Sequence, residues 1–156
     1  MLTSDEIIYN ILTTAKEDGN PLLQHFHIKY PSKDVAREDN NIFVACVSSE
    51  PNNELFEATE YRDLVEVLVV TKIRDYKRAI TVIKTVVKEI IRLIKSSNEF
   101  QVRPVVRNIA PEYNPNFVLT KGHILIEVLT EIEDYNTESD VEKVCKIILK
   151  DNIEVD

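Results

Sequence analysis

The 156-residue chain contains only two glycines and two cysteines, one methionine and no tryptophan. Gly19 and Gly122 alone cannot form a glycine-rich phosphate loop or a dinucleotide fingerprint, which excludes the common nucleotide-dependent enzyme classes. Cys46 and Cys145 are far apart in the sequence, in unrelated apolar contexts, without the close spacing of metal or redox motifs. We therefore interpret both cysteines as small core residues with free thiols.

Long hydrophobic runs are also missing. No run approaches the roughly 18 to 20 apolar residues that span a bilayer, and Met1–Asp5 lacks the basic and apolar regions of a secretory signal. We expect no membrane association, and a protein that stays where it is made. The hydrophobic share of 44% and charged share of 29% are typical of globular proteins. A chain of this length predicts a single domain over residues 1–156.

The charge is unevenly distributed. The formal net charge is −8, which argues against sequence-blind binding of nucleic acid. Residues 72–107 nevertheless hold ten basic and three acidic residues, so this segment carries +7 and the remainder −15. The basic segment is therefore a candidate binding surface.

The first third of the chain predicts one helix and the start of a sheet. Thr3-Ser4-Asp5-Glu6 matches a capping box, and apolar residues then recur at helical spacing until the turn-forming residues at 18–21. Residues 22–30 suggest a short strand, and 31–41 a loop. A strand over 42–47 and a turn over 48–53 follow.

The next strand, over about residues 56–72, contains the run Leu64-Val65-Glu66-Val67-Leu68-Val69-Val70. This run is apolar on both faces, whereas a sheet with one face in water alternates apolar and polar residues. We therefore expect the strand to be central, in a sheet that is covered on both sides.

A long amphipathic helix is predicted over 75–96, capped by Asp75. At about 100° per residue, four lysines share one narrow stripe and the apolar residues lie opposite. The lysines are Lys77, Lys84, Lys88 and Lys95, and the apolar residues are Ala79, Ile83, Val86, Ile90, Leu93 and Ile94.

The last third predicts two strands and a helix. We expect strands over 102–109 and 117–132, a turn over 111–116, and a bulge or break at Gly122. Ser139-Asp140-Val141-Glu142 predicts a short last helix with Val144, Cys145, Ile148 and Leu149 on its apolar face, fraying after Lys150. The fold class is thus α+β in the order α-β-β-α-β-β-α, with a mostly antiparallel sheet on a long helix. The predicted core includes Val44, Leu68, Val70, Ile83, Val86, Ile90, Ile124 and Ile126.

Catalytic and metal-binding patterns are incomplete. His25 and His27 would share one face of a strand, but no third ligand is evident, although an acidic residue or His123 could approach through the fold. The carboxylates of Glu131, Glu133 and Asp134 are interpreted as a solvated acidic loop. Ser48 and Ser49 lack the glycine-flanked turn of a catalytic serine. We expect no enzymatic activity, metal or cofactor.

The basic segment allows three interpretations: a phosphate-binding groove, a solvated face or a protein interface. Tyr76 is the only aromatic residue on the helix, so the base-stacking residues of a nucleic-acid site are missing. The candidate protein interface consists of Arg74, Lys77, Lys84, Lys88, Arg92, Lys95, Arg103 and Arg107.

The order of elements resembles the tail terminator and tail-completion proteins of tailed bacteriophages and prophages. The resemblance rests on the leading helix that ends at Asn20-Pro21, the hairpin Ile42–Lys72 with its turn at 50–53, the helix Asp75–Ser96 and the strand Phe117–Ile132. The family has no catalytic residues.

This resemblance implies a small α+β subunit that forms a homo-oligomeric ring, commonly a hexamer. Such a ring caps the tail tube and joins it to the head connector, in the tail or neck of a virion assembled in the host cytoplasm. DNA would pass through it without sequence-specific binding. Residues 48–60 and 110–116 would be docking loops. The alternatives are another head-tail connector or neck protein, a small-molecule-binding α+β regulatory domain around Lys121-Gly122-His123, or an enzyme of unfamiliar type.

Overall fold

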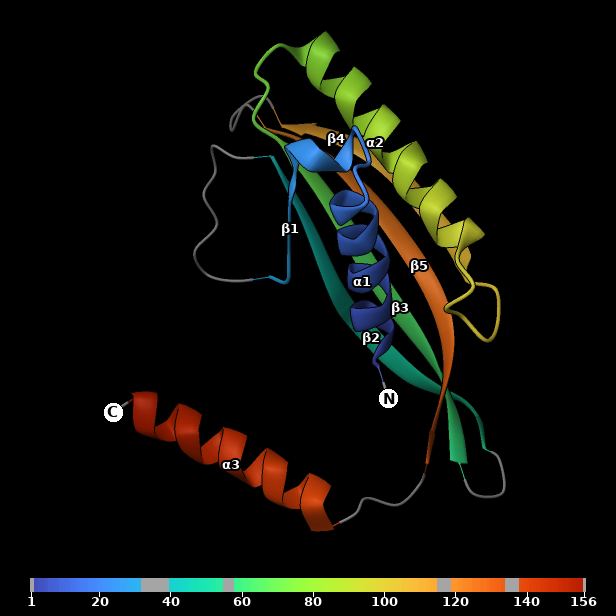
Figure 1. Cartoon of the computed structure of the whole chain (residues 1–156), viewed down its shortest axis with the longest axis vertical. Helices are drawn as coiled ribbons and strands as arrows, with labels where there is room; N and C mark the ends of the chain where they lie inside the picture. The colour runs from blue at the N-terminus through green and yellow to red at the C-terminus, as the bar shows by residue number, and fades with distance from the viewer. Residues whose placement is uncertain (1, 32–39, 55–57, 115–118, 134–137, 156) are drawn as a thin grey trace.

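The computed structural model describes residues 2–31, 40–54, 58–114, 119–133 and 138–155. Three α-helices, a short 3-10 helix and five strands follow one another along the chain (Figure 1). They are α1 (Ser4–Glu17), η1 (Leu23–His25), β1 (His27–Lys29), β2 (Asn41–Glu54), β3 (Ala58–Thr71), α2 (Tyr76–Ser96), β4 (Val105–Asn114), β5 (Leu119–Glu133) and α3 (Glu138–Val155).

The five strands form one sheet in the order β1-β2-β3-β5-β4. β1 pairs with β2 in parallel, and the other three pairings are antiparallel. The predicted α+β class and mostly antiparallel sheet are confirmed, and β3 is the central strand as expected. The short strand predicted within 22–30 is β1, preceded by η1.

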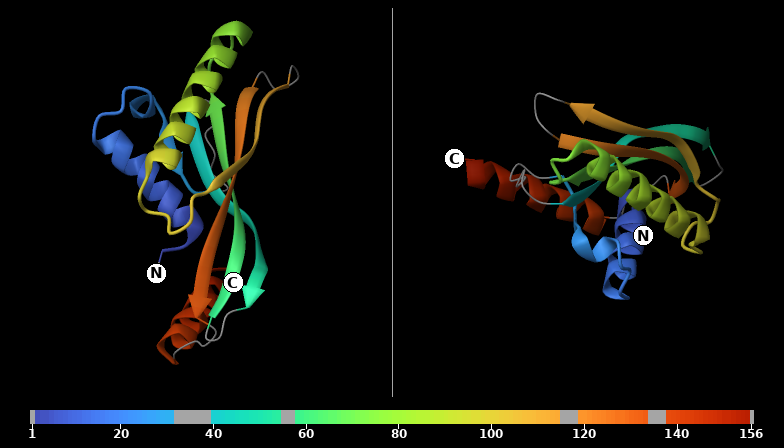
Figure 2. Two further views of the ribbon diagram at one scale, coloured as in Figure 1. Left: turned by 90° about the vertical axis from the view of Figure 1, so that its right-hand side faces the viewer. Right: turned by 90° about the horizontal axis from the view of Figure 1, so that it is seen from above.

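Helices α1 and α2 pack on the same face of the sheet (Figure 2). The core lies between these two layers and contains six of the eight predicted core residues. Leu68 and Val70 were predicted there but lie on the opposite face, because alternation on β3 turns Val67 and Val69 inward instead. Cys46 and Cys145 are free thiols, but both are exposed, so the core prediction for them is wrong.

Helix α1 begins where the sequence predicts, with a different cap. Thr3 is the N-cap residue, yet its side chain makes no capping hydrogen bond. The Ser4 hydroxyl donates instead to Asp63 Oδ2 of β3 at 2.5 Å. The helix is therefore tied to the sheet at its first residue, and Gly19 in the turn after it has a φ of +93° that favours glycine.

Helix α2 matches its prediction closely. The Asp75 side chain accepts a hydrogen bond from Arg78 N at 2.9 Å, which caps the helix. Five of the six predicted apolar residues are buried, Leu93 is half-buried, and Val87 joins them against the sheet. The lysine stripe faces away from the core.

Two predicted turns are strands in the structure. β2 continues through residues 48–53, because register shifts at Cys46/Ser48 and Pro51/Asn53 accommodate the turn-forming residues. β4 includes Pro111, which the sheet tolerates because β4 is an edge strand. Most of the predicted docking loops at 48–60 and 110–116 is therefore strand, while residues 55–57 and 115–116 lie outside the described residues.

Gly122 neither bulges nor breaks its strand. β5 runs from Leu119 to Glu133 in continuous register with β3. A Cβ atom at Gly122 would lie 2.7 Å from Ile83 Cγ2 and 2.9 Å from Val87 Cγ2. Glycine is thus required because α2 crosses β5 closely at this point.

Helix α3 is longer than predicted, since it extends to Val155 rather than fraying after Lys150. Its described side chains, at 141–150, are all exposed. Within the described ranges, no helix is long and apolar enough to cross a bilayer.

Candidate protein interface

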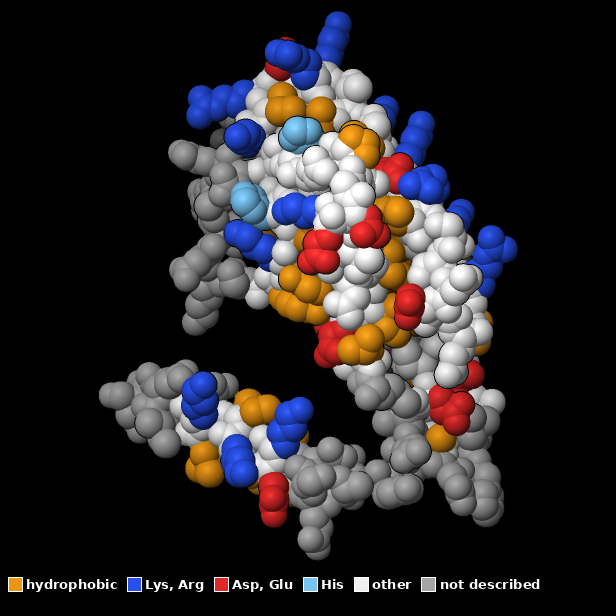
Figure 3. All heavy atoms as spheres, in the orientation of Figure 1, with side chains coloured by type: hydrophobic (Ala, Val, Ile, Leu, Met, Phe, Trp, Pro, Cys, Tyr) orange, Lys and Arg blue, Asp and Glu red, His pale blue; other side chains and the backbone are white. Residues whose placement is uncertain are grey.

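The basic stripe, defined as Lys77, Lys84, Lys88 and Lys95 with Arg74 and Arg92, lies on the outer side of α2 and just before it. All six residues are exposed. Blue side chains follow the outer edge of α2 in Figure 3, while acidic side chains gather over α1 and toward the end of the β2–β3 hairpin. The helix that anchors the core therefore also presents a positive surface to solvent.

Only Arg92 of the basic stripe has an ion-pair partner among the described residues. Arg92 Nε donates to Glu89 Oε1 at 3.0 Å, and Asn20 Nδ2 donates to the same oxygen at 3.3 Å. The hydrogen bond from Arg92 lowers the pKa of Glu89, and Glu89 in turn raises the pKa of Arg92. The four lysines and Arg74 are left available to another molecule.

Arg103 and Arg107 are exposed too, but Arg107 belongs to a different surface. It sits at a register shift of β4 and reaches Glu127 Oε2 at 3.0 Å, while Arg62 Nε lies 3.0 Å from Glu127 Oε1. Glu127 faces away from the core between the buried Ile126 and Val128. Arg107 therefore lies on the sheet face opposite α2.

The weighed metal-binding patterns do not converge. His25 is on η1 rather than on the strand with His27, and both side chains are exposed. His123 Nδ1 lies 3.9 Å from Glu66 Oε2 on the far face of the sheet. Glu131 is exposed, and Asp134 lies outside the described residues. No group of three or more potential metal ligands occurs in the described part of the chain.

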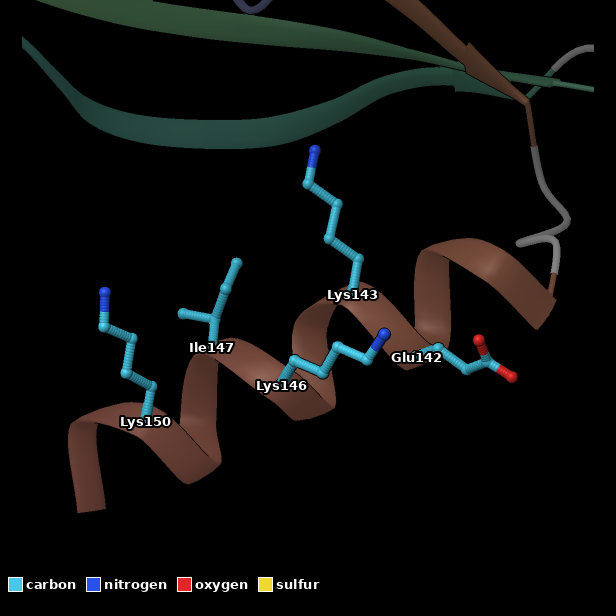
Figure 4. A pocket seen from close by; sticks show the side chains of 5 residues that line it. All are labelled: Glu142, Lys143, Lys146, Ile147 and Lys150. Atoms are coloured by element: carbon cyan, nitrogen blue, oxygen red, sulfur yellow. The ribbon is translucent and has the colours of Figure 1, made fainter. Parts of the chain in front are cut away.

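A pocket of about 460 Å³ runs along α3 (Figure 4). Its lining residues are Glu142, Lys143, Lys146, Ile147 and Lys150. All five come from one helix, so among the described residues no second element brings an opposing group to a ligand. The pocket is a surface groove and lacks the convergent polar groups of an active site.

Asp63 is a buried polar centre that the sequence did not reveal. Its carboxylate is 8% exposed and accepts three hydroxyl hydrogen bonds, from Ser4 at 2.5 Å, Ser49 at 2.5 Å and Thr130 at 3.1 Å. These donors come from α1, β2 and β5. An acidic residue immediately before the apolar run of β3 was the only available signal. The arrangement ties these three elements to β3 and thus supports the fold.

The fold has a counterpart in a virus-like particle. A chain in the virion of a native gene transfer agent (GTA) particle superposes with a TM-score of 0.59 at 7% sequence identity. The match covers 80% of this chain and 92% of the GTA chain. At this identity the likeness shows a shared fold. No protein-family model matches the sequence, and no curated protein matches it.

The GTA chain is matched over nearly its full length, so the shared unit includes most of the two-layer body. The surface features described above are properties of this chain's own residues. The basic stripe on α2 is a feature that sequence reasoning identified and that the structure exposes.

Proposed function

We propose that this chain is a non-enzymatic structural subunit of a virion, of the tail-terminator type. Copies of it form a ring that caps a tail tube and joins it to the head connector. The observation that carries the proposal is the shared fold with a chain of a virion particle, matched over 92% of that chain's length. The order of elements in the sequence supports the same role.

The charge distribution supports self-assembly. In a ring, each subunit uses two different patches, and opposite charges on these patches orient the subunits and speed their encounter. The basic stripe supplies one patch. The remainder of the chain, with a formal charge of −15, supplies acidic surface, including Asp5 and Glu6 on α1 and Glu50 on β2. The interface role of the basic stripe is part of this proposal.

The small-molecule regulatory domain has less support. Lys121-Gly122-His123 lies within β5, and Gly122 is packed against α2 instead of opening a ligand loop. The groove along α3 offers no enclosed site. Among the described residues, no comparable structural feature argues against assembly.

The test is the assembly state of a charge-reversal variant. Lys84→Glu with Lys88→Glu should leave the melting temperature nearly unchanged, because exposed ion pairs contribute only about 0 to 1 kcal/mol each. Association should weaken, because like charges would then face each other across the interface. Size-exclusion chromatography with light scattering, at low and high salt, measures both parent and variant.

Lys84→Arg with Lys88→Arg is the matched control, since it retains both charges and should assemble like the parent. A parent that stays monomeric at every concentration would reject the ring. Assembly of the glutamate variant that equals the parent's at every salt concentration would remove the basic stripe from the interface.

A further inference from the structure

Helix α3 has an apolar arc that the described structure leaves uncovered. Over residues 141–150, at about 100° per residue, the apolar residues span about 200°, and Glu142, Lys143, Lys146 and Lys150 occupy the remaining side. The five aliphatic residues are 52% to 60% exposed, and Cys145 is exposed as well. The arc consists of Val141, Val144, Cys145, Ile147, Ile148 and Leu149.

No other described element packs along α3. The helix lies to one side of the end of the β2–β3 hairpin, away from α1 and α2 (Figures 1 and 2). Isolated helices of this length are marginal in water, so an amphipathic helix normally owes its stability to packing of its apolar face. The arc therefore requires a partner surface.

The sheet of the same chain has a second face on which no described helix packs. The run at 64–70 is apolar on both faces, as in sheets covered on two sides, yet α1 and α2 cover only one. The other face contains an apolar cluster across β2, β3 and β5, which we call the open-face patch. It consists of Phe43, Ala45, Leu64, Leu68, Val70 and Leu125.

Cross-strand register makes the open-face patch continuous. Phe43 lies opposite Leu68, and Leu125 lies opposite Glu66, diagonal to both Leu64 and Leu68. Phe43 lies between the core residues Ile42 and Val44 on β2, so alternation places its side chain on this second face, where it is 9% exposed. Glu66 lies within the patch, and Lys121, His123 and Glu127 lie beside it on the same face of β5. Glu66 Oε2 is 3.9 Å from His123 Nδ1.

The apolar arc fits within the open-face patch. From Val141 to Leu149 the arc is about 12 Å long, and from Leu64 to Val70 the patch spans about 20 Å along β3. An arc of about 200° is wider than the narrow seam of a two-helix coiled coil and suits a broad surface such as a sheet.

The orientation of α3 favours another copy over the chain's own sheet. Lys143, Ile147 and Lys150 point to the side of α3 on which β2 runs (Figure 4). Val141 and Cys145 lie about 150° or more around the helix from that direction. The centre of the apolar arc thus faces away from the body to which α3 belongs.

We propose that α3 of one copy packs its apolar arc on the open-face patch of a second copy. Every copy then donates one helix and receives one, so a closed ring leaves neither surface exposed. This inference rests on the proposed self-assembly and adds a second contact to that of the basic stripe. Because both complementary surfaces belong to this chain, a foreign partner is unnecessary.

The first test links α3 to the patch in the full-length protein. Cys46→Ser removes one exposed thiol, and Leu68→Cys places a new thiol in the open-face patch. The native Cys145 on α3 supplies the second thiol for the cross-link. A short bismaleimide should then join different copies, with a yield at least fivefold above that of the matched control Thr81→Cys on α2. A bridge within one chain, found by mass spectrometry, would overturn the proposal, as would Cys145–Cys145 linkage alone.

The second test changes the arc itself. Val144→Asp with Ile148→Asp should weaken self-association at least tenfold, whereas Lys146→Gln with Lys150→Gln on the charged side should not. Both variants should keep the parent's melting temperature when monomeric, because α3 packs along no other described element. Assembly with parental affinity in the aspartate variant would overturn the helix exchange alone. A parent that never assembles would overturn the proposed ring as well.

Discussion

Gly122 shows how a single missing methyl group sets the distance between two layers. Gly122→Ala should lower the free energy of unfolding by about 1–3 kcal/mol, because its Cβ would overlap Ile83 and Val87 of α2. Chemical denaturation measures the effect. The double variant with Ile83→Ala should cost less than the sum of the two single variants, since the overlap with Ile83 is removed. Strict additivity would mean that the two residues are not in tight contact.

Asp63 has an equally local role. Asp63→Ala should destabilise the fold by at least about 1–3 kcal/mol, because the hydroxyl of Ser4, which is 1% exposed, loses its acceptor in the interior. Asp63→Asn retains an acceptor oxygen and should cost less. Glu131→Ala, at an exposed position, is the control in urea unfolding. Equal stability of the Ala variant and its control would show that Asp63 does not hold the three elements together.

Among the elements, α2 contributes most of the helical side of the core. Ile90→Ala should lower the free energy of unfolding by about 2–5 kcal/mol, because the side chain is fully buried against the sheet. Leu68→Ala, on the half-exposed open face, should cost clearly less in the monomer. Thermal unfolding of both variants checks the assignment of the two faces. If Ile90→Ala unfolded at the same temperature as the parent, the packing of α2 on the sheet would be contradicted.

The elements that the sequence predicted best are those with a strong local signal. α2 has both a cap at Asp75 and a complete apolar face, so its bounds and buried side follow from periodicity alone. β3 was assigned to the centre of the sheet because of its unbroken apolar run. Which of its faces the helices cover could not be decided, because alternation is uninformative when both faces are apolar.

The errors arose where tertiary context overrides local preference. Ser48, Pro51 and Asn52 favour turns, but pairing with β3 extends β2 through them by means of two register shifts. Pro111 lies within β4 because an edge strand can omit one donor. The hydroxyls of Ser4, Ser49 and Thr130 meet at Asp63 only in the folded chain, so no sequence spacing announces that cluster.

At the scale of the whole molecule, the sequence predicts a sheet covered on both faces and the described chain covers one. If other copies cover the second face of the sheet, the melting temperature should rise with protein concentration. Only the folded assembly would bury the open-face patch and the apolar arc of α3. Calorimetry over a hundredfold range of concentration measures this. Val144→Asp with Ile148→Asp should make the melting temperature depend less on protein concentration. If the parent assembles but its melting temperature does not depend on concentration, the second face of the sheet is not covered by other copies.

The two register shifts of β2 have a further consequence, for aggregation. β1 pairs with β2 only at residues 41–43, so beyond Phe43 no described strand pairs with that edge of β2. A long, flat edge recruits strands from other chains without control, whereas bulges and proline disrupt the regular hydrogen-bonding row. Both shifts and Pro51 occur in this unpaired part. The irregularities that made β2 resemble a turn in the sequence thus oppose the growth of fibrils through this sheet edge.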